Sequence, residues 1–402
     1  MKLNRWLHIM ILFFLVTAGF LLFTRSSETA SAQPLPECRV GLVMPTTGGM
    51  APYGAEGVIA GRVAHEEATY NFRDCKPILL VQDSGSDPTQ ANSAAAVLVS
   101  KPNSVLALVG EINSADTAAM VSQARSAGVP ILAPTASMIS LTQMATNIFR
   151  IWPSDAYEAS KMAEHMINEG INDVAVLYIE VPYGKEMATY FKNAFEKAGG
   201  RITVEGYPKD TFDFTPLLQR SKRHQAIYII SYIEDAALLL KKAYELRQKS
   251  QERSNGFRIY GTSVLDSMSL VEKAGLGAEG LTFAVVQPGA DGDTAKRTAF
   301  LSAYKAAREK AQSEPALRSA AREPTFVAFH VYDAISITFA ACESYVKKQQ
   351  LSGASISDFL RNLTGFSGVT GQIAFDNKGD LATSRTVVFK HVKGGQINTL
   401  LK

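Results

Sequence analysis

Cysteine and histidine are scarce in this chain of 402 residues, which has three cysteines and six histidines. No two cysteines have the spacing of metal ligands and the histidines are scattered, so we expect no metal site and no cofactor. A strong excess of basic charge is missing too, because the formal net charge is only +3. No basic stripe with interleaved aromatic residues occurs either, so we predict no nucleic-acid partner.

Common enzyme motifs are also missing. The sequence has no phosphate-binding P-loop, no nucleophile elbow and no H-E-x-x-H zinc motif. The glycines at 275–280 have the spacing of a dinucleotide-binding loop, but they follow an expected helix and precede an expected strand, the reverse of the required order. We interpret them as a helix stop and turn, and we predict that the protein is not an enzyme. Catalytic groups can assemble across a fold, so an enzyme on the same architecture stays an alternative.

The first 32 residues have the features of a secretion signal. A basic start precedes an apolar run over 6–23, and a polar segment then ends in the A-S-A pattern at 30–32, which is typical of signal-peptide cleavage sites. Cleavage before Gln33 predicts a periplasmic protein. Because the apolar run is long and Arg25 follows it closely, an uncleaved membrane anchor is the alternative.

The rest of the chain is too long for one ordinary core, so two domains are the default. Strand and helix patterns alternate in two successive sets, over about 39–151 and about 157–286. Such alternation gives parallel strands joined by right-handed crossovers. We therefore predict an α/β fold with two doubly wound parallel-sheet lobes.

The stretch 105–140 indicates where a site would form. Apolar runs over 105–109 and 129–133 flank a helix pattern, which makes a strand–helix–strand unit. The polar residues that follow these two strands are Asn113, Ser114, Thr135 and Ser137. They fall at one sheet edge, where open α/β sheets bind ligands, and a helix start beside small hydroxyls suits a carboxylate. The alternative is that they only cap helices and satisfy loop backbone.

The cysteines suggest one disulfide. Cys38 opens the first expected strand, and Cys75 lies just before the second. If these strands are parallel neighbours, their starts are adjacent, so we predict a Cys38–Cys75 disulfide in an oxidising compartment. Closing that loop would stabilise the fold by about 3–4 kcal/mol. Cys342 falls in a helix pattern and is expected to be a buried thiol.

The order and spacing of several segments together resemble the type I periplasmic binding proteins, and within them the leucine/isoleucine/valine-binding receptors of ABC importers. The segments that carry the resemblance are 45–54, 109–137, 181–184, 213–216 and 370–380. The family has a ligand cleft between two lobes that are joined by three hinge segments and close around the ligand. The lobes implied here are 38–152 plus 288–366 and 154–286 plus 368–402.

The resemblance also implies roles for individual residues. Ser114 takes the family's serine position in carboxylate binding, and Thr135 and Ser137 take the paired positions after the fourth strand. Aromatic positions of the family's cleft are matched by Tyr53, Tyr183 and Tyr232. Each tyrosine could instead be an amphipathic loop residue that covers apolar surface.

One position departs from the family pattern. Amino-acid receptors place a glutamate against the ligand ammonium, and Ser263 occupies that position here. A serine cannot offset an ammonium charge removed from water. The residues that might compensate are Glu111, Glu180 and Asp266; otherwise the ligand is an organic acid, an amide or urea. We expect Ser263 and Asp266 to face the end of the ligand away from its carboxylate.

These patterns together predict a monomeric solute-binding protein that captures an amino acid or a related carboxylate and delivers it to a membrane ABC permease. Closure around the ligand would supply the signal that the permease reads. Two further alternatives stay open. The first is a ligand-sensing module that passes its state to a signalling partner, which an uncleaved anchor would favour, and the second is an interaction protein with a vestigial cleft.

Overall fold

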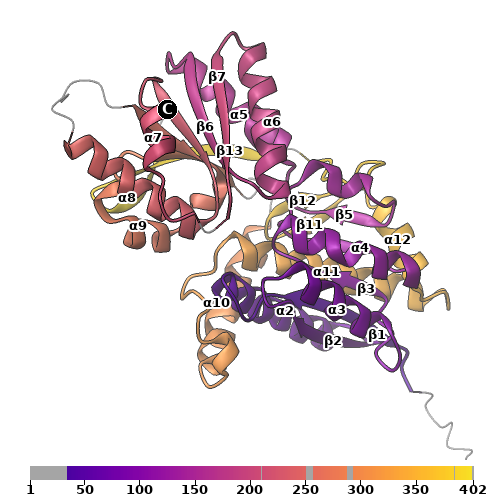
Figure 1. The fold of residues 1–402 in the computed structure, drawn as a ribbon. Helices are drawn as coiled ribbons and strands as arrows, with labels where there is room; N and C mark the ends of the chain where they lie inside the picture. Colours follow the sequence, from indigo (N-terminus) through magenta and orange to yellow (C-terminus); the bar gives the residue numbers. More distant parts are fainter. Residues whose placement is uncertain (1–33, 210, 250–256, 288–292, 384, 401–402) are drawn as a thin grey trace, which may run out of the picture. The chain divides into compact units, whose positions relative to one another are not determined.

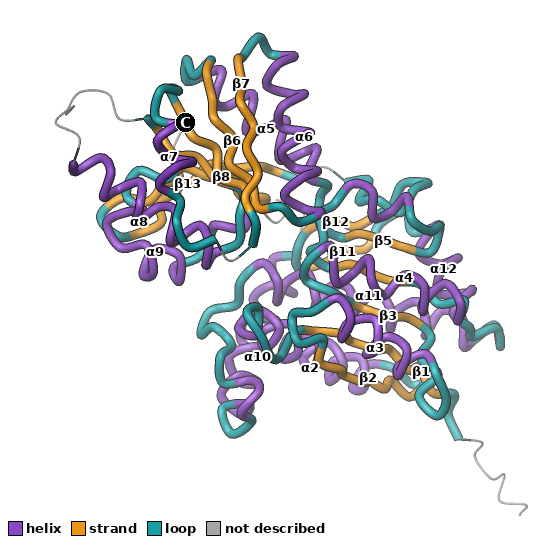
Figure 2. The backbone as a smooth tube through the Cα atoms, viewed as in Figure 1, coloured by secondary structure: helices purple, strands orange, loops and turns teal. Residues whose placement is uncertain are grey.

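The computed structural model of the protein describes residues 34–209, 211–249, 257–287, 293–383 and 385–400. The signal peptide predicted over 1–32 lies outside these residues. Residues 37–402 form one compact unit. It is an α/β fold with two mainly parallel sheets, each of which has helices packed against it (Figures 1 and 2).

The first sheet has five parallel strands in the order β2-β1-β3-β4-β5. These strands are β1 (Glu37–Met44), β2 (Lys76–Asp83), β3 (Ala107–Val109), β4 (Ile131–Ala133) and β5 (Ile148–Arg150). The elements between and after them are α2 (Ala51–Asn71), α3 (Pro88–Val99), α4 (Ser114–Ala127) and the 3-10 turn η1 (Ile139–Gln143). Late segments join this lobe, namely α10 (Thr294–Ala311), η4 (Pro315–Leu317), α11 (Phe326–Val346), α12 (Gly353–Arg361) and the hairpin β11 (Phe366–Gly368) with β12 (Gly371–Ile373). In Figure 1 the orange α10 and α11 lie beside the indigo α2, although most of the chain separates them in sequence.

The second sheet has seven strands in the order β14-β13-β10-β9-β8-β6-β7. Its parallel strands are β6 (Asp173–Ile179), β7 (Arg201–Tyr207), β8 (Ala226–Ile230), β9 (Arg258–Gly261) and β10 (Thr282–Gln287). Two antiparallel strands extend it, β13 (Thr386–Lys393) and β14 (Gln396–Thr399). The other elements of this lobe are α5 (Asp155–Asn168), α6 (Pro182–Lys197), α7 (Thr215–Ser221), α8 (Ile233–Lys249), η2 (Ser263–Leu265), α9 (Met268–Ala274) and η3 (Gly275–Ala278). The glycines at 275–280 therefore do form a helix stop and turn.

The inner strands of each sheet are buried on both faces, which explains why β4 and β8 are continuously apolar, whereas the strands β7 and β14 at the edges of the second sheet are more exposed and more polar. Successive strand side chains point to opposite faces. In β1, Val40 and Leu42 enter the core that includes α11, whereas Val43 enters the core that includes α4. The second sheet repeats this arrangement, with Leu177 on one face of β6 and Val176 on the other. The two-lobed α/β architecture predicted from the alternation of strands and helices is confirmed, while the residue boundaries predicted for the lobes stay a prediction.

The helix α11 is the central core helix of the first lobe. It is the one helix among the described residues that is long and apolar enough to cross a membrane, with a mean hydropathy of 1.2 over its most apolar window. Within the fold, 72% of that window is buried. A helix that is apolar on all sides fits this place because the sheet, α2 and α12 pack around it.

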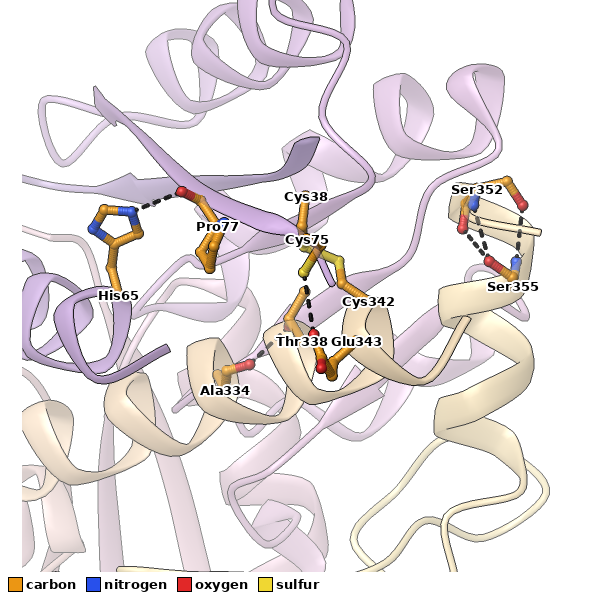
Figure 3. The surroundings of a disulfide bond; sticks show 10 residues. All are labelled: Cys38, His65, Cys75, Pro77, Ala334, Thr338, Cys342, Glu343, Ser352 and Ser355. Carbon is orange, nitrogen blue, oxygen red and sulfur yellow. Dashed lines mark hydrogen bonds between the residues drawn. A yellow bond between two sulfur atoms is a disulfide. The ribbon is translucent and has the colours of Figure 1, made fainter. Parts of the chain in front are cut away.

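The predicted Cys38–Cys75 disulfide is wrong, because Cys38 is bonded to Cys342 with a Cα–Cα distance of 6.0 Å (Figure 3). The strands β1 and β2 are parallel neighbours as expected, but their register sets Cys38 opposite Pro77, so Cys75 lies two residues away from the required position. The helix α11 instead brings Cys342 to the start of β1. Cys75 is a buried free thiol 3.5 Å from the Glu343 carboxylate, and burial raises its pKa to about 12.

Candidate functional site

A small cavity lies beyond the carboxyl ends of β3 and β4 and is lined by residues of both lobes. The volume of this cavity is about 60 Å³. Its lining residues are Met50, Tyr53, Ile112, Asn113, Ser114, Thr135, Ser137, Tyr183, Tyr232, Val264 and Phe326. Most of the binding residues predicted from the sequence are therefore gathered around one space, which we call the inner cavity.

One side of the inner cavity carries three hydroxyl groups, and we call it the hydroxyl wall (Ser114, Thr135 and Ser137). The Ser114 Oγ accepts a hydrogen bond from the Met138 N–H at 3.1 Å, which leaves the Ser114 hydroxyl proton free for another acceptor. Thr135 donates its own proton to the Ile112 carbonyl at 2.8 Å. Ser114 is thus the member of the wall best prepared to donate to a ligand oxygen.

Asn113 begins helix α4 beside this wall. Its Oδ1 accepts from the Asp116 N–H at 2.9 Å, and its Nδ2 donates to the Asp116 carboxylate at 2.7 Å. The side chain is therefore occupied as a helix cap. Its direct contact with a ligand stays a prediction, whereas the cap itself holds the positive end of α4 at the inner cavity.

Most of the remaining lining is apolar and aromatic, and we call its four rings the ring wall (Tyr53, Tyr183, Tyr232 and Phe326). The Tyr183 and Tyr232 rings are stacked at 5.9 Å with an interplanar angle of 20°, and Tyr53 lies 6.3 Å from Phe326. The Tyr183 hydroxyl donates to Thr262 at 2.9 Å, and burial raises its pKa well above the usual value. Burial also raises the pKa of the Tyr53 hydroxyl to about 12 and that of the Tyr232 hydroxyl above its usual value. Both hydroxyls therefore keep their protons well above neutral pH.

Two of these tyrosines occupy equivalent places in the two lobes. Each follows a proline in the first turn of a helix and precedes a glycine, at 52–54 in α2 and at 182–184 in α6. A Cβ atom added to Gly54 would lie 2.0 Å from the Pro45 carbonyl oxygen, and one added to Gly184 would lie 2.0 Å from that of Ile179. Glycine lets each helix start approach its strand closely, and this fixes the position of the preceding ring.

The sequence reasoning missed several cavity residues, namely Met50, Ile112, Val264 and Phe326. Phe326 comes from the start of α11, where Thr325 is the N-cap. The buried Glu56 of α2 accepts from the Thr325 N–H at 2.9 Å and from its hydroxyl at 2.7 Å, which fastens the two helix starts together. Thr325 is a typical helix-capping residue and could have marked the start of α11 in the sequence. Nothing in the sequence, however, shows that this helix start lies beside Tyr53.

Three buried acids surround the hydroxyl wall without lining the inner cavity. Glu111 accepts from the Ile112 N–H at 2.6 Å and is hydrogen-bonded to Ser84, and burial raises its pKa to about 8. Burial also raises the pKa of Asp155, the neighbour of Ser137, to about 8, and that of Glu158 to about 7. With these pKa values Glu111 and Asp155 are largely neutral at neutral pH and do little to repel an anion in the inner cavity, whereas Glu158 is about half ionised.

Comparison with known proteins agrees with this geometry. Residues 37–396 match the family described as periplasmic binding protein. The chain belongs to that family. A similar protein is the leucine-, isoleucine-, valine-, threonine- and alanine-binding protein of Pseudomonas aeruginosa, 25% identical over 93% of this chain and 92% of that protein. Another is the Leu/Ile/Val-binding protein homolog 3 of Brucella melitensis, 24% identical over 87% of this chain and 90% of that protein.

Solved structures give the same architecture for this periplasmic binding protein. The leucine-binding protein LivK of Thermotoga maritima is 26% identical, with a TM-score of 0.77, over 91% of this chain and 98% of that one. A solute-binding protein of an ABC transporter from Rhodopseudomonas palustris, solved with benzoate, has a TM-score of 0.71 at 20% identity over 91% and 95% of the two chains. The second likeness concerns the fold alone.

Two predicted contacts of the periplasmic binding protein lie elsewhere than in the inner cavity. Ser263 is buried, and its N–H and hydroxyl donate to the two oxygens of Glu158 at 2.7 and 2.5 Å. Asp266 accepts from Lys390 at 2.8 Å, so its charge already has a partner. Neither residue lies among those that line the inner cavity, and their contact with a ligand stays a prediction.

A wider space, the outer cavity, adjoins the inner cavity of the periplasmic binding protein. The volume of the outer cavity is about 890 Å³. The residues that line both cavities are Met50, Tyr53, Tyr232 and Val264. Charged groups line the outer cavity, among them Asp266 with Lys390, and Glu234 with Lys273 at 2.5 Å. The polarity therefore changes from a charged outer cavity to an inner cavity without charged side chains.

Proposed function

We propose that the protein is the solute receptor of an ABC importer and that it binds a small carboxylate in the inner cavity. The observation that carries this proposal is the hydroxyl wall, which lies at the amino end of α4 and shares the inner cavity with the ring wall, whose Tyr183 and Tyr232 come from the other lobe. A carboxylate there would accept the free Ser114 proton and lie at the positive end of the helix. The rings would cover the rest of the ligand.

The charges around the hydroxyl wall support an anion rather than a cation. The pKa of Glu111 is raised to about 8 and that of Asp155 to about 8 by burial, so both hold their protons at neutral pH. An ionised acid at either place would repel a carboxylate in a region from which water is largely removed. The inner cavity thus combines hydrogen-bond donors with a lining that, among the described residues, contains no acidic side chain. The nearby Asp116 already accepts from the Asn113 Nδ2 at 2.7 Å.

Binding a ligand without a chemical reaction fits the family of periplasmic binding proteins, to which the chain belongs. Among the described residues, no group of three or more histidine, cysteine or acidic side chains is placed to hold a metal ion. The periplasmic binding protein would work in the periplasm after removal of residues 1–32, as a monomer, and would present its liganded, closed form to a membrane permease. Ligand binding stabilises the closed form, and this difference is the signal available to the permease.

A thermal-shift screen of the chain from Gln33 to Lys402 tests the proposal. The panel holds amino acids, their amides, urea, and aliphatic and aromatic carboxylates. A ligand at about 100 times its dissociation constant adds about 2.7 kcal/mol of stability, which is easily measured. We expect a shift with at least one carboxylate, and a clearly smaller shift with the same compound in the Ser114→Ala variant. No shift across the panel, or binding of a neutral solute alone, would contradict the proposal.

A second function is favoured by one feature of the sequence, the long apolar run over 6–23 with Arg25 close behind it. If that run is an uncleaved anchor, the protein would sense its ligand at the membrane and pass its state to a signalling partner. Fractionation of cells that express the full chain separates the two functions. Recovery in the soluble periplasmic fraction, with Gln33 as the first residue, supports the importer receptor, and recovery in the membrane fraction supports the sensor.

A further inference from the structure

We infer that the ligand is a monocarboxylate with an apolar or aromatic body and no ammonium group. This inference rests on the proposed function and specifies its substrate class. It depends on which charged groups of the described residues reach the inner cavity, and on what those groups already contact.

The inner cavity offers a ligand no charged partner. Among the described residues, its lining contains no aspartate, glutamate, lysine, arginine or histidine. A ligand ammonium enclosed there would lose its water without gaining a counter-charge, which is a large penalty. A carboxylate, in contrast, meets hydroxyl donors and the amino end of α4. The lining therefore favours the carboxylate end of an amino acid and disfavours its ammonium end.

The acids that might compensate for Ser263 are engaged elsewhere. Glu111 is fully buried against Ser84 and the backbone at Ile112. Glu180 lies against Gly206 and lines neither cavity. Asp266 is held by Lys390 in the outer cavity. None of them presents an uncompensated charge to a ligand between the two walls.

Three buried acids lie closer to the lining, and the first of them, Asp116, already accepts from the Asn113 Nδ2 at 2.7 Å. Both oxygens of Glu158 already accept hydrogen bonds from Ser263, and Glu158 is not among the residues that line the inner cavity. Asp155 adjoins Ser137, and its Oδ2 has no hydrogen-bond partner among the residues that the structure describes. Burial raises the pKa of this carboxyl to about 8, so at neutral pH it carries a proton and no charge. A neutral Asp155 can donate a hydrogen bond, but it would have to lose its proton, against the desolvation that raises its pKa, before it could offset an ammonium charge.

The ring wall supplies the complement to such a ligand. The stacked Tyr183 and Tyr232 and the pair Tyr53 and Phe326 present ring surface, with Val264 between the two cavities. The Tyr183 hydroxyl is already bonded to Thr262. Ring surface and aliphatic side chains gain free energy by covering apolar groups, and aromatic pairs add a preference for flat ones.

Matched pairs of ligands that differ only in the amino group test the inference. The pairs are 4-methylpentanoate with leucine and 3-phenylpropionate with phenylalanine, measured at pH 7 by calorimetry. In the chain from Gln33, Trp152 is the sole tryptophan and its ring lies 5.0 Å from Phe326, so its fluorescence offers a second readout. We expect the deaminated acid of at least one pair to bind about tenfold or more tightly than its partner.

Each other outcome is decisive. Amino acids that bind as tightly as the deaminated acids, or more tightly, would overturn the inference and leave the proposed function in place. If the Asp155→Asn variant then loses amino-acid binding, Asp155 is the ammonium partner. If no compound in either pair or in the wider panel binds, both the inference and the proposed function fail.

A designed change of the cavity provides an independent test. Val264→Glu places a carboxylate where the inner and outer cavities meet, and Val264→Gln is the uncharged control of similar size. We expect the glutamate variant to weaken binding of the acid and to reduce its preference over the amino acid by about tenfold or more relative to the glutamine variant. Circular dichroism confirms that both variants are folded. An unchanged preference in folded Val264→Glu would contradict the inference.

Discussion

The two walls of the inner cavity are built in different ways. The hydroxyl wall comes from one strand–helix–strand unit, and its residues follow β3 and β4 directly. The ring wall comes from segments far apart in the chain, with Tyr53 in α2, Tyr183 in α6, Tyr232 after β8 and Phe326 at the start of α11. The difference teaches that a polar site at a sheet edge is a local feature, whereas an apolar wall depends on the packing of the whole fold.

The two equivalent tyrosines sharpen this comparison. Tyr183 is buried in its own lobe, where Thr262 holds its hydroxyl. Tyr53 is only partly buried and packs against the cores of both lobes, with Ser267 of the second lobe within hydrogen-bonding reach of its hydroxyl. We therefore expect Tyr183 to be a fixed part of the ring wall, and Tyr53 to be the ring whose contacts change when the lobes close.

The largest expected effect concerns the support of the ring wall by α11. Replacing Cys342 by Ala removes the disulfide between this helix and β1, which closes a segment with a sequence separation of 304. We expect the free energy of unfolding to fall by about 3–5 kcal/mol in urea denaturation. Cys75→Ala is the matched control, and we expect it to change stability far less. An equal effect of the two substitutions would contradict the Cys38–Cys342 pairing.

The next effect concerns the hydroxyl wall. Removing the Ser114 hydroxyl deletes a hydrogen bond to a charged ligand group, so Ser114→Ala should weaken binding by about 1.5–3 kcal/mol, or roughly 10- to 150-fold, in calorimetry. Thr135→Val is the informative partner, since the Thr135 proton is already given to the Ile112 carbonyl. We expect a smaller loss of affinity there. A larger loss for Thr135→Val would reverse the roles assigned to the two hydroxyls.

The buried acids behind the hydroxyl wall predict a pH dependence of stability. Burial raises the pKa of Glu111 to about 8, whereas the unfolded carboxyl ionises near 4.5. Between these values the folded state keeps a proton that the unfolded state has lost, so the free energy of unfolding falls as pH rises towards 8. Below about pH 6.5 the buried His330, whose pKa is lowered to about 3, contributes the opposite slope.

Urea denaturation between pH 6.5 and 8.5 checks this expectation. We expect stability to decline through this range and Glu111→Gln to flatten the decline by at most about 1.4 kcal/mol per pH unit. Glu164→Gln, at an exposed position on α5, is the control and should leave the slope unchanged. A stability that rises with pH between 6.5 and 8 would show that these acids are ionised in the fold.

The smallest effect concerns the ring that is fixed in its own lobe. Tyr183→Phe keeps the ring but leaves the Thr262 hydroxyl without its bond from Tyr183. We expect a loss of about 1 kcal/mol in the free energy of unfolding and little change in ligand affinity. Tyr232→Phe is the comparison, and we expect the smaller change in stability. A marked loss of affinity in Tyr183→Phe would mean that the hydroxyl itself contacts the ligand.

Much of the fold was predictable because strand and helix patterns repeat along the chain and parallel sheets follow from them. The polar residues after β3 and β4 were predictable for the same reason, since the carboxyl ends of parallel strands meet at one edge. The disulfide was predicted wrongly because Cys342 reaches Cys38 through the packing of α11, which strand order does not reveal. Phe326 and Val264 were missed on similar grounds, because their positions depend on how distant segments pack.

Ser263 shows a second reason why the contacts of a site cannot all be predicted from the sequence. Its place in the family pattern predicts a residue that faces the ligand, and that contact stays a prediction, while in the fold its N–H and hydroxyl donate to Glu158. Glu158 lies more than a hundred positions earlier in the chain and gave no signal of this contact. The orientation of a short polar side chain is decided by the nearest buried acceptor, and tertiary packing alone fixes which acceptor that is.

The central claim is that a carboxylate is held between the two walls, and a crystal structure of the protein with its tightest carboxylate ligand tests it most directly. We expect one carboxylate oxygen within hydrogen-bonding distance of the Ser114 Oγ, near the amino end of α4, and the body of the ligand against Tyr183 and Tyr232. A ligand seated in the outer cavity, or turned so that its carboxylate faces the ring wall, would contradict the account.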